Sequence, residues 1–154
     1  MQEFASMEDI FAFAIAEEEA AEQFYLELAG KMKRAHLQKV FQDFAAEERG
    51  HKAKLLAVKA GKISLLTDEM VPDLKITEYL PDISPEQQGQ ALDYLPGLIM
   101  AMKKEMAAFQ LYTTLAENTA NVDFQNLFFA LAQEEAKHKL RLEIEYDDQF
   151  LNQM

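Results

Sequence analysis

The chain repeats one segment of its own sequence without a gap, and this repeat limits the possible folds more than any other feature. The offset between the copies is 135 − 48 = 87 residues, the separation of Glu48 and Glu135. The same offset relates His51 to His138. A repeat of this kind indicates that one supersecondary unit occurs twice in the fold.

Each copy contains two stretches in which apolar residues recur at alternating steps of four and three. This is the period of a helix that packs against partner helices. The stretches cover residues 7–32, 37–58, 98–115 and 124–142. The sequence therefore predicts an all-α fold, a four-helix bundle made of two repeated helical hairpins.

The helix ends also carry signals. Ser6 is the expected N-cap of the first helix and Asp123 that of the fourth, because short polar side chains accept hydrogen bonds from the first turn. Pro96 is expected to open the third helix. Gly61 suits the position that ends the second.

Each of these apolar stretches forms the buried seam of one helix. Polar residues of the types that bind metal lie in the middle of these seams. In each copy one Glu precedes a Glu-x-x-His pair, and this i, i+3 spacing places both side chains on one helix face, about 5–6 Å apart at Cβ. Glu18 and Glu48 are equally far from Lys33, so a hairpin that turns there brings them to the same height. The candidate metal ligands are Glu18, Glu48, His51, Glu105, Glu135 and His138.

Four carboxylates and two imidazoles in one layer match the ligand pattern of di-iron carboxylate bundles. Two divalent cations would neutralise four carboxylates that are very unfavourable to bury alone. Oxygen and imidazole ligands without thiolate favour iron or manganese over structural zinc. Glu48 and Glu135 are the expected bridging ligands, and Glu18 and Glu105 the expected terminal ligands.

The connection from Gly61 to Leu95 shows no sustained helical period. Its length fits a crossover that runs along the bundle, as in ferritin-like folds. A functional loop and a disordered linker are the other interpretations. Ser84-Pro85-Glu86 indicates the start of one short helix within it. We expect residues 1–154 to form a single domain.

The composition excludes several classes of function. A formal net charge of −12 argues against nucleic-acid binding, for which a basic face is expected. The absence of cysteine excludes disulfides, thiolate metal sites and cysteine nucleophiles. The N-terminus lacks the form of a signal peptide, and no apolar run reaches the length of a membrane span. These features predict a cytoplasmic protein without a membrane segment.

The ligand motifs, together with the pairs Glu18…Tyr25 and Glu105…Tyr112, resemble those of the rubrerythrin branch of the ferritin-like superfamily. The resemblance covers about Phe4 to Leu142. It implies a non-haem di-iron bundle, a homodimer or larger, that reduces hydrogen peroxide or oxidises ferrous iron. Tyr25 and Tyr112 either hydrogen-bond ligand carboxylates in support of catalysis or are amphipathic core residues.

The chain departs from the family pattern in two ways. Full-length rubrerythrins carry a rubredoxin domain with four cysteines, and this chain has none, so electrons would come from an external donor such as a rubredoxin-like protein. Many members also carry a Glu one turn after the third-helix ligand, where this chain has Ala108. Three functions remain open: a di-iron peroxidase, a ferroxidase or iron-handling protein, and a non-catalytic metal-binding bundle.

Overall fold

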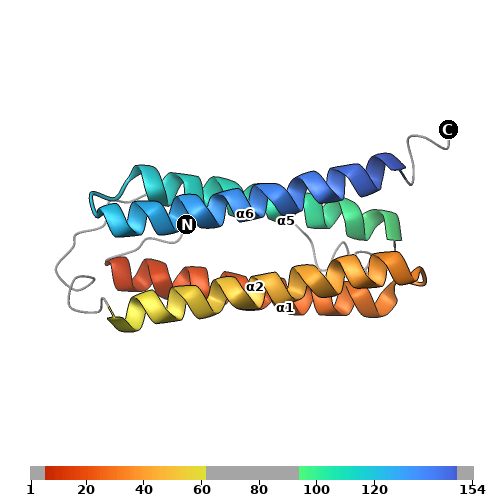
Figure 1. The fold of residues 1–154 in the computed structure, drawn as a ribbon, viewed down its shortest axis with the longest axis horizontal. Helices are drawn as coiled ribbons and strands as arrows, with labels where there is room; N and C mark the ends of the chain where they lie inside the picture. Colours follow the sequence, from red (N-terminus) through yellow and green to blue (C-terminus); the bar gives the residue numbers. More distant parts are fainter. Residues whose placement is uncertain (1–5, 62–93, 149–154) are drawn as a thin grey trace. The chain divides into compact units, whose positions relative to one another are not determined.

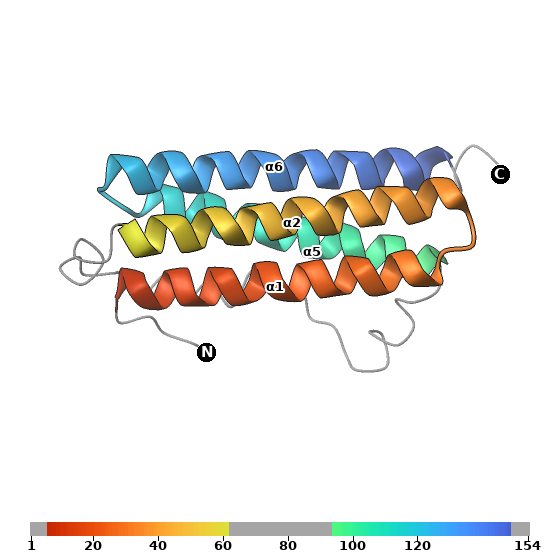
Figure 2. The same cartoon turned by 60° about the horizontal axis from the view of Figure 1, so that its bottom comes forward.

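The computed structural model describes residues 6–61 and 94–148, and in these ranges it contains four α-helices (Figure 1). They are α1 (Met7–Lys31), α2 (Ala35–Gly61), α5 (Tyr94–Glu117) and α6 (Val122–Tyr146). α1 packs against α2, and α5 packs against α6. The two views show that each pair runs antiparallel (Figures 1 and 2). The two predicted hairpins are therefore confirmed.

Both hairpins turn in the same way, and the repeat explains why. In the first, the Gln38 side chain donates a hydrogen bond of 2.6 Å to the carbonyl of Met32. In the second, Gln125 donates one of 2.7 Å to the carbonyl of Thr119. Each Gln thus satisfies a carbonyl in the turn that follows the preceding helix. The offset of 87 residues therefore relates turn contacts as well as helix seams.

The helix ends agree with the sequence in part. Ser6 caps α1, since its hydroxyl accepts a hydrogen bond of 3.2 Å from the Asp9 backbone N–H. At α6 the predicted cap was wrong: Asn121, not Asp123, accepts from Phe124 N–H at 3.1 Å. α5 begins two residues before Pro96. Proline is tolerated there because the N–H groups of the first turn have no intrahelical partner in any case.

The core of each hairpin repeats as well. Tyr25 stacks on Phe41 with ring centroids 6.0 Å apart, and Tyr112 stacks on Phe128 at 6.2 Å. All four rings are fully or almost fully buried. Aromatic pairs at this separation add favourable contact beyond the area that they bury. They fix the register of α1 on α2 and of α5 on α6 in the same manner.

The chain divides into two compact units, and each holds one hairpin. The predicted connection from Gly61 to Leu95, with its crossover and its short helix at Ser84, lies almost entirely outside the described residues. The single domain over 1–154 stays a prediction. Within the described ranges, no helix has the length and apolar character that a membrane crossing requires.

Candidate metal centre

The first hairpin brings three predicted ligands together from two helices. Glu18 comes from the middle of α1, and Glu48 and His51 come from adjacent turns of α2. His51 Nδ1 lies 3.3 Å from Glu48 Oε1 and 3.5 Å from Glu18 Oε2. All three residues are buried, between 1% and 6% exposed. We refer to these residues as the first triad.

The second hairpin repeats this arrangement with Glu105 from α5 and with Glu135 and His138 from α6. His138 Nδ1 lies 3.5 Å from Glu105 Oε1, which matches the His51–Glu18 contact of the first triad. These three residues are also buried. They form the second triad, and the offset of 87 residues relates each member to its counterpart.

Each triad can hold a metal ion. In both, every residue offers one ligand atom, and these atoms lie within 4.8 Å of one another. In the first triad, one side-chain oxygen or nitrogen atom each of Glu18, Glu48 and His51 is shielded from solvent. In the second triad, the same holds for Glu105, Glu135 and His138. Carboxylate oxygen with imidazole nitrogen, and no sulfur, is a donor set for iron or manganese. The residues of each triad therefore fit such an ion.

The carboxylates change the protonation of the first triad's imidazole. Burial by itself lowers the pKa of His51, because a charged ring is poorly solvated there. Contact with Glu18, and then with Glu48, more than offsets this effect and raises the pKa from 6.5 to about 9. Without metal, His51 is therefore protonated at neutral pH and supplies positive charge between two carboxylates. His51 would have to release this proton before its nitrogen could hold a metal ion together with the two carboxylates.

The sequence reasoning missed an ion pair beside the first triad. Glu22, one turn after Glu18, is largely buried and accepts a hydrogen bond of 2.6 Å from Arg49 Nε. Lys52 and Glu19 form a second contact between α2 and α1 at 3.3 Å. Arg49 and Lys52 lie close to His51 in the sequence, but the steps of four and three between apolar residues do not indicate that Glu22 is buried. The pairs tie α1 to α2 at the level of the triad.

Two further Glu residues next to ligands and the third histidine lie apart from the triads. Glu47 is exposed, and Glu134 forms a surface ion pair with Lys137 at 3.3 Å. His36 is exposed near the start of α2. Tyr25 is buried in the first hairpin core, and its predicted hydrogen bond to a ligand carboxylate stays a prediction, as does that of its repeat counterpart.

The hairpins and triads define a class of protein: an all-helical chain whose buried carboxylates and histidines can bind metal. The family model described as Rubrerythrin matches residues 9–82 and 97–154. The chain therefore belongs to the rubrerythrin family, which confirms the family expected from its motifs. No curated protein matches the chain.

Two solved structures are similar over nearly the whole chain. A hypothetical protein from Pyrococcus furiosus has 27% identity and a TM-score of 0.67, over 92% of this chain and 89% of its own. A protein from Thermotoga maritima, described as a ferritin-like diiron-carboxylate protein, has 22% identity and a TM-score of 0.69. That match covers 97% of this chain and 99% of the other. The fold is therefore ferritin-like, as the sequence predicted.

Proposed function

We propose that the two triads together supply six ligands for two iron ions, and that the protein reduces hydrogen peroxide with electrons from a separate donor protein. The observation that carries this proposal is the pair of buried triads, equal in composition and related by the repeat. Membership of the rubrerythrin family supports iron and an oxidoreductase function. Manganese is the alternative metal, because the same donor atoms bind it well.

Reduction of peroxide to water takes up two electrons and two protons: H2O2 + 2e− + 2H+ gives 2H2O. Two ferrous ions held by the triads would supply these electrons. The chain itself provides a dry, charge-balanced site, since two Glu carboxylates in each triad offset the charge of one divalent ion. Tyr25 and Tyr112 are the candidate hydroxyl groups to deliver a proton, because both phenols are buried in the same hairpins as the ligands.

Electrons have to arrive from outside these residues. The 154 residues contain no cysteine, so they hold no four-cysteine iron centre that could pass electrons to the triads. We therefore propose an external donor of the rubredoxin type. We also propose that the protein is a homodimer in the cytoplasm.

A ferroxidase is the second candidate, and Ala108 favours it. Many rubrerythrins carry an additional Glu ligand at this position of the third helix, one turn after the equivalent of Glu105. Ala108 has no ligand atom, so the oxidised site has one carboxylate fewer to stabilise it. A weaker hold on oxidised iron favours release of iron over repeated turnover.

The test compares two oxidants. Protein loaded anaerobically with ferrous iron is mixed in a stopped-flow instrument with hydrogen peroxide or oxygen at equal concentration. We expect faster oxidation by peroxide, and steady turnover only with an added reductant protein. If oxygen reacts faster and the iron is then released or mineralised, the ferroxidase function replaces the peroxidase.

The chain offers a matched control for this comparison. Glu48→Ala with Glu135→Ala removes one ligand from each triad and is expected to abolish iron binding and turnover. Glu47→Ala with Glu134→Ala changes the adjacent Glu in each repeat, and these residues point away from the triads. This control pair should retain both properties. Iron binding that survives the first pair of substitutions would contradict the proposed site.

A further inference from the structure

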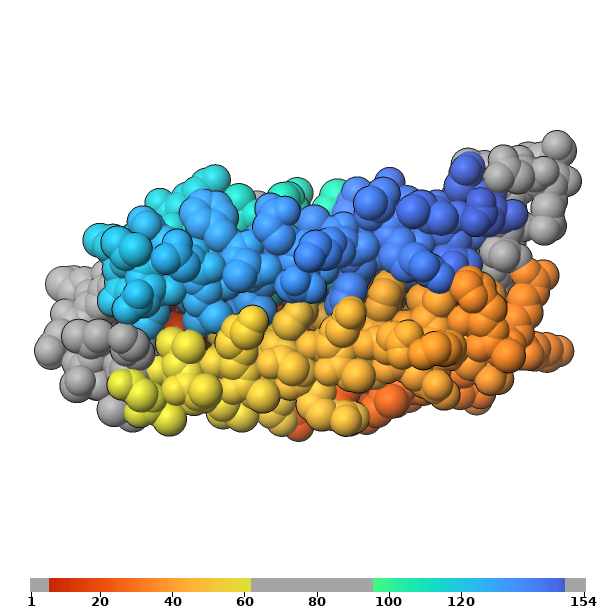
Figure 3. All heavy atoms as spheres, viewed as in Figure 1, coloured from red at the N-terminus to blue at the C-terminus, as the bar shows by residue number. Residues whose placement is uncertain are grey.

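The second half of α2, residues 49–61, is basic although the chain as a whole is strongly acidic. It holds four Lys or Arg residues and no Asp or Glu, whereas the whole chain has 15 Lys and Arg against 27 Asp and Glu. Atoms of this half of α2, drawn in shades of yellow, lie at the surface in the space-filling view (Figure 3). We call its four cations the α2 basic face: Arg49, Lys52, Lys54 and Lys59.

The repeat supplies an internal comparison for this face. An offset of 87 residues relates 49–61 to 136–148 of the second hairpin, which holds three Lys or Arg residues and four Asp or Glu residues. Arg49 itself corresponds to Ala136, and Lys59 corresponds to Tyr146. Both hairpins nevertheless form the same turn, aromatic stack and triad. These shared features therefore do not require the positive charge of the first hairpin, which needs another explanation.

Most of this positive charge is available to a partner in solution. Arg49 has 63% of its side chain exposed, while the carboxylate that binds it, Glu22, has only 11% exposed. Lys54 forms no ion pair with any residue in the described ranges, and the same holds for Lys59. Lys52 alone is paired with an exposed carboxylate. Three of the four cations thus present charge that no exposed carboxylate of the described residues offsets.

Small and apolar residues occupy the outward side of α2 between these cations. Ala53 and Ala57 are exposed, and Leu56 is 45% exposed. Gly50 lies in the interior of the helix, and a Cβ atom added there would meet nothing within 4 Å. Glycine is among the poorest helix formers, so the hairpin itself does not favour it at this position. An apolar centre with a polar rim is typical of a protein interface, and glycine lets a partner's backbone come close.

The first triad lies directly behind this surface. Glu48 and His51 are on the buried side of the same helical turns that present Arg49 and Gly50 to solvent. The two sides of a helix are separated by one helix diameter, about 10–12 Å with side chains. A partner on the α2 basic face therefore comes close to the residues that are proposed to hold iron.

We propose that the α2 basic face is the docking surface for an acidic electron-donor protein, which delivers electrons through α2 to the first triad. This docking site rests on the proposed function, because it identifies where the external donor binds. Two one-electron donors D are oxidised for each peroxide that is reduced: 2D(red) + H2O2 + 2H+ gives 2D(ox) + 2H2O.

The charge of the chain favours an acidic partner at this place. Without the four cations of the face, the remainder of the chain carries a formal charge of −16. An acidic donor is therefore repelled by most of the molecule and attracted to the second half of α2. Charge complementarity orients a partner and speeds its encounter more than it strengthens binding. This suits a donor that has to leave after each electron.

The size of the surface also suits an electron donor. Transient complexes of redox proteins are small, with less than about 1,200 Å² of total surface buried. The 13 residues from 49 to 61 form a helix segment about 20 Å long, at 1.5 Å per residue. A segment of this length can supply one side of such a contact.

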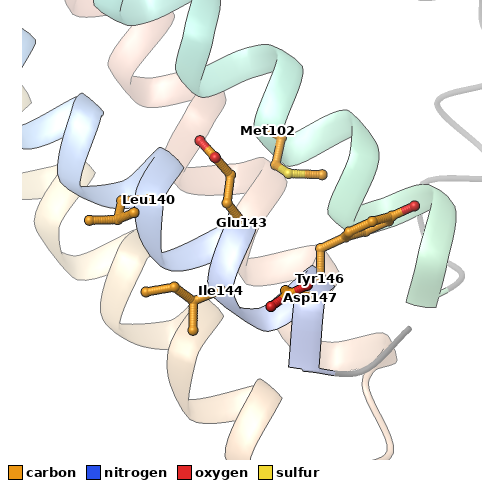
Figure 4. A pocket seen from close by; sticks show the side chains of 6 residues that line it. All are labelled: Met102, Leu140, Glu143, Ile144, Tyr146 and Asp147. Carbon is orange, nitrogen blue, oxygen red and sulfur yellow. The ribbon is translucent and has the colours of Figure 1, made fainter. Parts of the chain in front are cut away.

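The pocket at the C-terminal end of α6 does not suit the same partner (Figure 4). Leu140 and Ile144 contribute apolar walls, but the charged residues that line it are Glu143 and Asp147. Both are acidic, so this pocket repels an acidic donor.

The first experiment measures the Kd for a rubredoxin of net negative charge, by fluorescence anisotropy of labelled rubredoxin at low and high salt. Lys54→Glu with Lys59→Glu should raise the Kd about tenfold at low salt. The effect should vanish near 1 M salt, where the screening length is about 3 Å. The control, Lys33→Glu with Lys39→Glu, makes the same change of net charge with two exposed residues at the turn of the same hairpin. It should bind nearly as the wild type does.

Equal Kd values for the two variants would overturn the proposal, as would a wild type that shows no salt-dependent binding. Tighter binding of DNA at the same residues, or association of two copies of the chain through them, would give the face another occupant and also overturn it. Competition with DNA and sedimentation without rubredoxin measure these two outcomes.

A second variant keeps the test valid if the charge reversal disturbs folding. Gly50→Lys introduces the residue that stands at the repeat-related position, Lys137, which α6 accommodates. The new lysine adds positive charge, so attraction alone predicts tighter binding of rubredoxin. A donor that sits over Gly50 is instead held away by the longer side chain and should bind more weakly. Tighter binding would therefore contradict docking at this place.

Turnover separates a failure of docking from a failure of the proposed function. Oxidation of the ferrous-loaded chain by peroxide in a single turnover needs no donor, and the Lys54→Glu with Lys59→Glu variant should react at the wild-type rate. In steady state with rubredoxin, this variant should show a higher KM for rubredoxin and an unchanged kcat. If peroxide does not react in the single turnover while rubredoxin still binds at the α2 basic face, the proposed function fails and the docking surface stands.

Discussion

The stability of the metal-free protein should depend on pH through His51, and the size of this effect follows from the residues around the imidazole. The pKa of His51 is about 9 in the folded chain against an ordinary value of 6.5. A pKa that rises on folding stabilises the fold fully below the unfolded value, and this stabilisation is lost as the pH rises through the folded value. The difference corresponds to about 3 kcal/mol of unfolding free energy.

The assay is denaturant unfolding of chelator-treated protein between about pH 6 and pH 10. The unfolding free energy of the wild type should exceed that of His51→Gln by the largest margin at the acid end. That margin should shrink by about 3 kcal/mol toward the alkaline end. His36→Gln, which replaces an exposed histidine of the same helix, is the control and should keep the wild-type pH slope. Parallel curves for wild type and His51→Gln would refute the ion contacts with Glu18 and Glu48.

The proton on His51 should also make metal binding depend on pH. A cation that binds His51 has to displace the proton held there at neutral pH. The apparent affinity for ferrous iron should therefore rise with pH up to about 9. Calorimetry in buffers of different ionisation enthalpy should detect proton release on binding near neutral pH. Binding without proton release would mean that metal does not contact His51.

Three further predictions concern the metal site. Anaerobic titration should saturate at about two ferrous ions per chain, because two metals share the ligand set, and a stoichiometry of one would contradict the paired triads. Glu18→Gln should lower the pKa of His51, since the Glu18 carboxylate contributes most of the upward shift of that pKa. NMR of the imidazole in metal-free protein measures this pKa, and an unchanged value would contradict the contact. Glu22→Gln should lower the free energy of unfolding by less than about 1 kcal/mol, because Arg49 is largely exposed and water screens the ion pair. Thermal unfolding measures this change, and a larger loss would indicate a structural role for Glu22.

The sequence predicted most of the fold because its constraints repeat. A seam period of three and four fixes which helix face is buried, and a gapless offset requires the second hairpin to copy the first. The buried positions of Glu18 and Glu48 follow from that seam. So does the contact between His51 and both carboxylates, since i, i+3 spacing and equal distance from the turn leave little freedom.

The sequence did not predict two contacts, because the spacing of apolar residues does not determine which partner a polar side chain finds. Asn121 and Asp123 are both good caps, and only the backbone path into α6 decides that Asn121 accepts the Phe124 N–H. Glu22 lies at the edge of the seam, where a carboxylate is equally compatible with water. Its burial depends on Arg49, which reaches across from the neighbouring helix.

Comparison of the two copies shows which residues a triad requires and which residues differ between the hairpins. Positions that shape a triad are kept between copies: the ligands, the stacked tyrosines and the glutamines that close the turns. Positions beside the triads are not kept: Glu22 and Arg49 of the first hairpin correspond to Phe109 and Ala136 of the second. An ion pair in one copy and apolar residues in the other cannot both be demanded by the same metal chemistry. The residues beside the triads therefore answer to a different constraint in each hairpin, which in the first is the ion pair that joins α1 to α2.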